Sequence, residues 1–352
     1  MNKLLDYFKQ NQEKIFEKKI HAYGWKSEYD TIITSSLTKY LFEDLDIIEN
    51  IAPRTNENRD GRIRDKYYIT VHDTGDAFSN HTAKFWSEAV KSEGWEYGKY
   101  ECSFQYVTGN DGIYHNIPDD EIAYHAGDTT MYDYALYDSG VSGDNKYPHI
   151  SISSDGYFEI DGRKSKILAP RAKKVKDGVV LYDKIATSDM INSQGILCKL
   201  IDGKYYLGET YFNTTYELIA NRGGNNNGIG IESCINEGSD IYLTWQRTAK
   251  LVAYLLDVNK LDFDAVKQHH YFSGKNCPQT IRMSNMWDYF MELVKFEYQI
   301  RQFRKQGYSL KLICEDDRVC ANGRVKKLSD KPYKFKIESE FKGKIESIEI
   351  EI

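Results

Sequence analysis

KYYITVHDTG, the stretch from Lys66 to Gly75, sets the fold class of this 352-residue chain. Residues 67–71 are β-branched or aromatic, the composition of a buried strand, and Gly75 ends the strand in a turn. His72 then lies at the carboxyl edge of the strand, where α/β folds place ligands. A lone histidine at such an edge is more often a hydrogen-bonded structural residue, so its role depends on what surrounds it. The stretch predicts an α/β protein with its site at one edge of a sheet.

The sequence around this stretch alternates between strand and helix patterns. An amphipathic helix is expected over residues 81–92, and CSFQYVTGNDGIYHNIP predicts two strands joined by a turn at residues 110–112. GIGIESCINEG, residues 228–238, predicts another buried strand. Helices are expected over residues 242–257 and 279–303. These elements predict a central β-sheet flanked by helices.

The composition divides the chain into a main domain with additions. Residues 1–60 are expected to form a polar N-terminal helical segment, followed by a polar linker, RTNENRDGR. The main domain is expected over residues 61–300. A β-rich insertion of short strand-like pieces and turns interrupts it at residues 129–227. Residues 301–352 alternate apolar and charged side chains, which predicts a small C-terminal β segment.

Charge and hydropathy exclude several classes of protein. The net charge of −6 argues against a nucleic-acid binder, which would show a basic face. Because no run of about 18 apolar residues occurs, we expect no membrane insertion. The start, MNKLLDYFKQNQEK, lacks the apolar region of a secretory signal, so we expect synthesis in the cytoplasm. The six cysteines are too few for a disulfide scaffold; Cys314 and Cys320 either pair across a hairpin or remain free thiols.

QHHYFSGKNCP, residues 268–278, carries two candidate metal ligands, His269 and Cys277. Imidazole nitrogen and thiolate sulfur are ligands that zinc prefers. Gly274 is expected to let the loop turn back so that Cys277 meets His269. Pro278 fits the first turn of the helix expected next.

Together with His72, these residues predict a site for one zinc ion with three protein ligands and an open fourth position. That composition is typical of catalytic zinc, which lowers the pKa of bound water from about 16 to roughly 7. Glu232 lies in an otherwise apolar strand, where a carboxylate is costly unless paired or functional, and is the candidate general base. Lys275 is placed to offset the charge of an oxyanion. The alternative is that the histidines are buried structural residues and Cys277 an inert core thiol.

Four motifs in order, VHDTG, GIYHNIPDDEIAYHAGD, GIGIESCIN and HHYFSGKNCP, resemble those of type-2 N-acetylmuramoyl-L-alanine amidases. This zinc family includes phage endolysins, bacterial autolysins and peptidoglycan recognition proteins. The resemblance covers residues 65–128 and 228–295. It implies a mixed central sheet and a zinc ion bound by His72, His269 and Cys277.

The resemblance also implies roles for neighbouring residues. Glu232 would be the general base, Lys275 would stabilise the transition state, and His125 would bind substrate. His270 is one place out of register with the family's ligand and is expected either to support the metal ligands or to be structural. Some members use a tyrosine near the position of Phe104, and its absence here moves more of the chemistry onto Glu232.

The implied activity is hydrolysis of the bond between N-acetylmuramic acid and L-alanine in peptidoglycan. The context expected is a phage endolysin released through a holin-type lesion, or an autolysin exported unconventionally. A non-catalytic peptidoglycan-binding or virion structural protein on the same fold is one alternative, although binding-only relatives typically lose the cysteine ligand. A zinc hydrolase of another peptidoglycan amide is another. The insertion either extends the substrate groove or decorates a remote surface.

Overall fold

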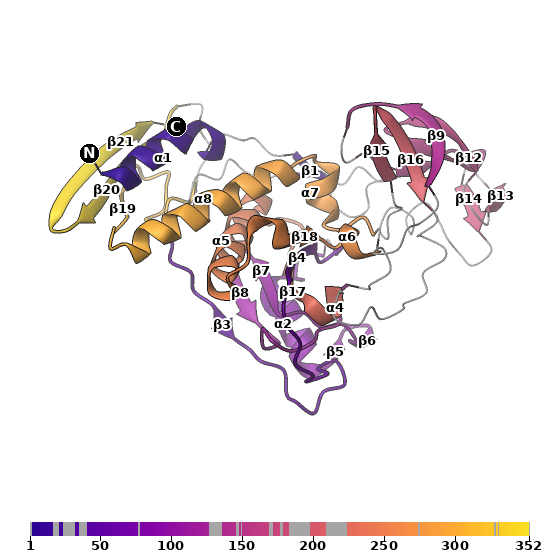
Figure 1. Cartoon of the computed structure of the whole chain (residues 1–352), viewed down its shortest axis with the longest axis horizontal. Helices are drawn as coiled ribbons and strands as arrows, with labels where there is room; N and C mark the ends of the chain where they lie inside the picture. The colour runs from indigo at the N-terminus through magenta and orange to yellow at the C-terminus, as the bar shows by residue number, and fades with distance from the viewer. Residues whose placement is uncertain are drawn as a thin grey trace.

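A mixed β-sheet with helices on both faces forms the centre of the molecule (Figure 1). The structure, a computed structural model, describes residues 2–16, 21–23, 32–34, 41–76, 78–126, 136–145, 148, 150–168, 172–176, 179–182, 198–208, 224–273, 275–326, 329 and 331–351. Within these residues the central sheet has six strands in the order β18-β4-β17-β7-β8-β3. Their bounds are β3 Ile48–Glu49, β4 Tyr68–Asp73, β7 Tyr106–Gly109, β8 Gly112–His115, β17 Gly228–Ser233 and β18 Val266–Gln268.

Strand direction in this sheet agrees with the predicted mixed α/β class. The strands β18, β4, β17 and β7 run parallel to one another, β8 pairs antiparallel with β7, and β3 runs parallel to β8. The β7–β8 connection turns at Asn110 and Asp111, as the sequence predicts. Because four parallel strands end together, their carboxyl ends form one edge that can carry a site.

Helices cover the two faces unequally. The long helices α5 (Ile241–Asn259) and α8 (Trp287–Lys305) pack on one face, and α2 (Ala83–Ser92) packs on the other. The helix expected over residues 279–303 is divided into α7 (Gln279–Met283) and α8, with three non-helical residues between them. Val71 and Ile231 face α5 and α8, so the next residue on each strand faces the opposite side. Those next residues are His72 and Glu232.

The N-terminal segment differs from the helical segment expected over residues 1–60. Among its described residues, helix α1 (Lys3–Phe16) is followed by strands β1 (His21–Tyr23), β2 (Ile32–Thr34) and β3. The apolar face of α1 packs on α8, where Tyr7 stacks on Phe296 with ring centroids 5.5 Å apart. Strand β3 joins the central sheet beside β8, so this segment contributes to the main fold instead of standing apart from it.

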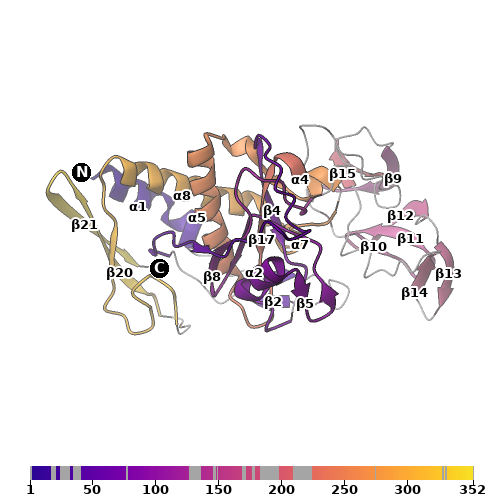
Figure 2. The same cartoon turned by 90° about the horizontal axis from the view of Figure 1, so that it is seen from below.

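The insertion and the C-terminal segment lie at opposite ends of the molecule (Figure 2). As expected, the described part of the insertion is all β structure between residues 136 and 208, in small antiparallel sheets. Its strands are β9 Leu136–Ser142, β10 Ile150–Ile152, β11 Tyr157–Ile160, β12 Arg163–Leu168, β13 Ala172–Lys176, β14 Val179–Tyr182, β15 Cys198–Ile201 and β16 Lys204–Gly208. The C-terminal sheet has the order β19 (Lys311–Ile313), β20 (Lys334–Phe341) and β21 (Lys344–Glu351), with alternate buried residues along β20.

The remaining elements are short. They are β5 Gly94–Trp95, β6 Gly98–Lys99, α4 Gly224–Asn227, the 3-10 helix η3 Phe263–Ala265 and α6 His270–Ser273. Of the two outcomes considered for Cys314 and Cys320, the structure has free thiols, as it does for the other four cysteines. Among the described helices, none has the length and apolar character needed to cross a membrane.

Candidate active site

Parallel strand pairing brings the predicted ligands together at the carboxyl edge of the sheet. His72 on β4 pairs directly with Glu232 on β17, and Gln268 on β18 pairs with Val71. His269, the residue after β18, therefore lies beside His72; their ring centroids are 4.6 Å apart. With Cys277 they form a buried cluster whose potential ligand atoms all lie within 4.8 Å of one another. The structure thus brings the three predicted ligands together in one cluster.

Asp73 holds the loop that carries Cys277. Its Oδ1 accepts a hydrogen bond from the backbone N–H of Gln279 at 3.0 Å, and its Oδ2 accepts one from the N–H of Thr280 at 2.7 Å. The thiol Sγ of Cys277 lies 3.7 Å from Nδ1 of His72. A buried carboxylate satisfying the first N–H groups of α7 acts as a cap and fixes the residues before the helix. Asp73 thus sets where Cys277 stands.

The loop closes on itself through the backbone. The N–H of His270 donates to the carbonyl of Cys277 at 3.0 Å, which agrees with a structural role for this residue. Pro278 precedes the first residue of α7, one position earlier than a first-turn proline. Gly274, on which the predicted turn depends, lies outside the described residues.

Burial keeps the two histidine rings of the cluster in the neutral form that binds a cation. It lowers the pKa values of His72 and His269 well below the ordinary range, and nearby positive groups lower them further, so both rings are neutral. Burial also raises the pKa of Cys277 well above the ordinary range. Neutral imidazoles are the ligand form, and a bound divalent cation would stabilise the thiolate.

Two atoms test whether these residues fit a metal ion. Nδ1 of His269 is buried and has no hydrogen-bond partner among the described residues, although a buried nitrogen is normally satisfied. Nε2 of His72 is occupied by His125, so its Nδ1 is the nitrogen that faces Cys277. One sulfur and two imidazole nitrogens facing a common point match the donor set of a zinc site.

His125 contacts the metal cluster instead of standing apart from it. Its Nδ1 lies 3.0 Å from Nε2 of His72. Burial, followed by the charge of Lys66, lowers the pKa of His125 to about 3, so the ring is neutral. The backbone N–H of His125 donates to Oδ1 of Asn225 at 2.8 Å. A partner on the far nitrogen fixes the orientation and tautomer of a ligating histidine.

The candidate general base and cation lie at the same edge. Oε1 of Glu232 is 3.8 Å from Nδ1 of His72, and its Oε2 has no hydrogen-bond partner among the described residues. Burial raises the pKa of Glu232 to about 8, against the lowering effect of Lys275. Burial alone would lower the pKa of Lys275, but Cys277 and Glu232 raise it, so the ammonium stays charged. Phe104 is buried in the core beneath α2 and offers no hydroxyl to this chemistry.

Sequence reasoning missed Asp73, Asn225 and the purpose of two glycines. A Cβ on Gly230 would lie 2.6 Å from Cγ of His125. One on Gly228 would lie 2.5 Å from the carbonyl oxygen of Gly224 and 2.7 Å from Oγ1 of Thr70, with Cε1 of His125 at 3.3 Å. Glycines two residues apart on a strand indicate close approach of another group on that face. The alternation in GIGIE was therefore a usable signal for the position of His125. For Asp73, the only signal in the sequence was its position next to His72.

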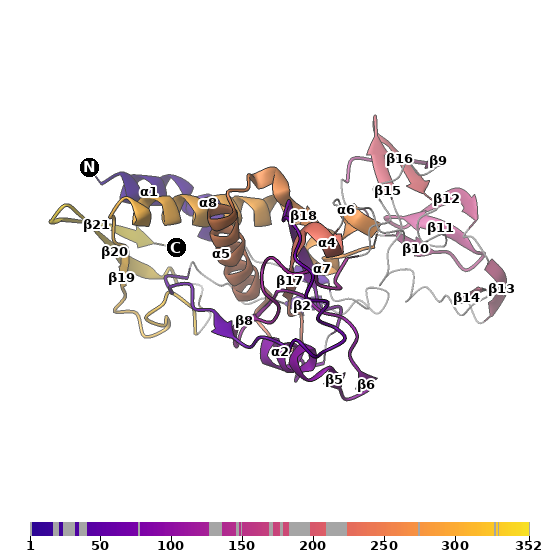
Figure 3. The same ribbon diagram turned by 60° about the horizontal axis from the view of Figure 1, so that its bottom comes forward.

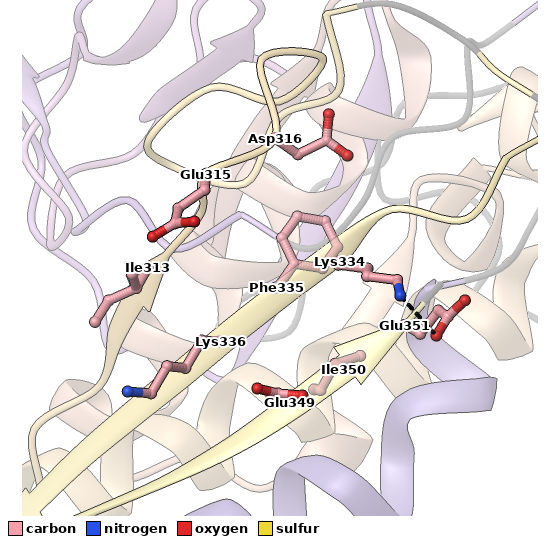
Figure 4. Close-up of a pocket in the computed structure, with 9 residues that line it drawn as sticks. All are labelled: Ile313, Glu315, Asp316, Lys334, Phe335, Lys336, Glu349, Ile350 and Glu351. Carbon is pink, nitrogen blue, oxygen red and sulfur yellow. Dashed lines mark ion pairs between the residues drawn. The ribbon is translucent and has the colours of Figure 1, made fainter.

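A separate pocket of about 430 Å³ lies on the C-terminal sheet (Figure 4). Its charged lining residues come from β20, β21 and the residues after β19, and include Glu315, Asp316, Lys334 and Glu351. Nζ of Lys334 lies 3.8 Å from Oε2 of Glu351, and Asp316 pairs with Arg318. None of the residues lining this pocket belongs to the histidine–cysteine cluster.

Comparison with known proteins gives a family match over the same elements. The family model described as N-acetylmuramoyl-L-alanine amidase matches residues 64–280, more than half of the chain. N-acetylmuramoyl-L-alanine amidase CwlH of Bacillus subtilis (strain 168) is 33% identical over 84 residues. That match covers 24% of this chain and 32% of CwlH, so the chain spans about a third of the length of this curated relative.

Solved structures of similar proteins have low identity. The catalytic domain of XlyA shares 18% identity with a TM-score of 0.42, and the match covers 71% of this chain and 99% of that domain. PlyL shares 15% identity with a TM-score of 0.40 and coverage of 71% and 97%.

Proposed function

The chain belongs to the N-acetylmuramoyl-L-alanine amidase family, and we propose that it hydrolyses the bond between N-acetylmuramic acid and L-alanine in peptidoglycan with one zinc ion. The observation that carries this proposal is the buried cluster of His72, His269 and Cys277, with the Glu232 carboxylate 3.8 Å from His72. A three-ligand cluster beside an acid–base group is the arrangement of catalytic zinc.

The zinc ion would be held by Nδ1 of His72, by the ring of His269 and by the thiolate of Cys277. When bound, it would supply an activated water and polarise the amide carbonyl. Glu232 takes a proton from the water as its oxygen adds to the carbonyl carbon. The same carboxyl then donates that proton to the alanine nitrogen as the C–N bond breaks, leaving a carboxylic acid, which keeps the second proton of the water, and a free amine. Its raised pKa suits a group that both accepts and returns a proton.

Lys275 and His125 support the chemistry of Glu232 and the metal ligands. Lys275 is charged and lies near Cys277 and Glu232, where it offsets the negative charge that develops on the carbonyl oxygen. His125 holds His72 through its far nitrogen. We assign His125 this orienting role beside the substrate-binding role that the resemblance implies.

The biological context follows from the same proposal. Peptidoglycan is the partner, and the cell wall is the place of action after synthesis in the cytoplasm. Release through a holin-type lesion during phage lysis fits a lytic amidase, and unconventional export of an autolysin is the second route.

Metal content and wall cleavage, measured together, test the proposal. The native chain is expected to carry about one zinc per molecule and to release L-alanine N-termini from purified peptidoglycan. Cys277→Ser should lose metal and activity. Glu232→Ala should keep metal and lose activity, because it removes the proton acceptor and leaves the ligands intact.

Each competing result has a distinct meaning. Binding to peptidoglycan without release of alanine N-termini would show that the fold serves recognition. Release of N-termini other than alanine would assign a different amide bond. A native chain that takes up no zinc would refute the site.

A further inference from the structure

A line of five aromatic side chains, here called the aromatic ridge, runs from the loop after β4 across α2 to the β5–β6 hairpin. Figure 3 shows α2 beside β5 and β6. The ridge consists of Phe78, His81, Trp86, Trp95 and Tyr97. Neighbouring ring centroids are 5.2, 5.4, 5.8 and 4.8 Å apart in that order. His81 and Trp86 are buried, whereas Phe78 and Tyr97 at the two ends are 56% and 62% exposed.

The buried His81 ring lies between acidic groups of the two segments that carry the exposed ends. Nδ1 of His81 lies 2.7 Å from Oδ2 of Asp76, and its Nε2 lies 3.2 Å from Oε1 of Glu96. Asp76 also accepts a hydrogen bond from the N–H of Phe78 at 2.8 Å. The His81 ring is therefore hydrogen-bonded to the loop that carries Phe78 and lies against the hairpin that carries Tyr97. Rings held this way lose little conformational freedom on binding a ligand.

The ridge is attached to the strand ends that carry the catalytic residues. Its loop begins directly after His72 and Asp73. The N–H of Thr74 donates to the carbonyl of Ser233, the residue after Glu232, at 3.0 Å. Nδ2 of Asn236 donates to the carbonyl of Ser79 at 3.2 Å. The loop of the ridge is thus held against the segment that follows Glu232.

We propose that the aromatic ridge is a carbohydrate-binding subsite for the glycan strand of the substrate. Phe78 and Tyr97 stack on the apolar faces of sugar rings, and the carboxylates of Asp76 and Glu96 accept hydrogen bonds from sugar hydroxyls. The inference rests on the proposed function, which places a glycan next to the cleaved amide.

The charges of the ridge favour a sugar over the peptide part of the same polymer. Asp76 and Glu96 place two acidic groups between the exposed rings. His81, which lies between these two carboxylates, is buried. A ligand with carboxylates would be repelled by these groups. A neutral saccharide offers hydroxyl donors to the carboxylates and C–H faces to the rings, so it satisfies both.

Binding of chitotetraose, a neutral oligomer of N-acetylglucosamine without peptide, tests the subsite independently of amide cleavage. The full chain is titrated by calorimetry and by tryptophan fluorescence, since Trp95 lies 4.8 Å from Tyr97. We expect Phe78→Ala and Tyr97→Ala each to weaken binding about tenfold through the lost stacking. Tyr97→Phe keeps the ring and should bind as the native chain does.

Tyr67→Ala is the matched control, because Tyr67 is 44% exposed but lies before β4, at the opposite edge of the sheet. Its binding should equal that of the native chain. The subsite is overturned if the native chain does not bind chitotetraose, or if both ridge variants bind it as tightly as the native chain. Ridge-dependent binding without release of alanine N-termini would refute the proposed function alone; release without ridge-dependent binding would refute the subsite alone.

Discussion

Replacing Gly230 by alanine should weaken metal binding without altering any ligand. The new Cβ would lie 2.6 Å from Cγ and 2.7 Å from Cδ2 of the His125 ring. Carbon atoms that are not bonded rest about 3.5–4.0 Å apart, so the ring must retreat by roughly 1 Å. Nδ1 of that ring lies 3.0 Å from Nε2 of His72, and a retreat of this size breaks the hydrogen bond.

Two magnitudes follow from this displacement. Loss of the group that orients a ligating histidine costs about 10–100-fold in metal affinity. Overpacking a buried contact costs about 1–3 kcal/mol of unfolding free energy. Zinc affinity of Gly230→Ala is measured by competition with a chromophoric chelator. Stability is measured by urea unfolding of the metal-free chain, which separates the packing effect from the metal effect.

A glycine with open surroundings supplies the control. A Cβ on Gly94 would meet nothing closer than 3.8 Å, so Gly94→Ala should leave zinc affinity and stability near native. The double variant Gly230→Ala/His125→Ala removes the overlap and should regain part of the unfolding free energy while zinc binding stays weak. A Gly230→Ala chain that binds zinc as tightly as the native chain would refute the orienting role of His125.

Three further predictions concern the surroundings of the site. Asp73→Ala removes the cap of α7 and should cost about 1–2 kcal/mol in urea unfolding and weaken zinc binding through Cys277; unchanged zinc binding would contradict the positioning of that loop by Asp73. Burial would raise the pKa of Asp257, but hydrogen bonds from three side chains of α8 lower it to about 2. Because the folded pKa lies below the unfolded value, the native chain should lose about 2 kcal/mol as the pH falls from about 4 to 2, whereas Asp257→Asn should lack this component in acid titrations. Lys250→Met leaves Glu297 buried without its partner at 3.0 Å and should cost about 3–5 kcal/mol, most of which Lys250→Met/Glu297→Leu should recover in thermal unfolding.

The candidate ligands could be predicted because their chemistry is local. Histidine and cysteine are recognisable as metal donors wherever they stand, and the strand that carries His72 is marked by its β-branched and aromatic residues. Parallel strands that end together bring their last residues to one edge, so the meeting of His72, Glu232 and His269 follows from the strand assignments.

The N-terminal segment shows where local pattern failed. Apolar spacing predicted helix throughout, whereas the described residues of this segment form helix α1 followed by short strands, of which β3 extends the central sheet. Strand β3 is held by its pairing with β8, about 65 residues later in the chain. A pairing over that separation leaves no periodic signal in a two-residue strand.

The sequence by itself determined the α/β class, the strand and helix order around the site, and the residue types available for metal and proton chemistry. These depend on composition and on periods of two and 3.6 residues, which operate over a few neighbours. Only the tertiary structure decided that Asp73 caps α7, that His125 lies against Gly230 and holds His72, and that His81 lies between the segments that carry the two ends of the aromatic ridge. Each of these is a contact between different segments, and its geometry is fixed by strand register and packing of the whole fold.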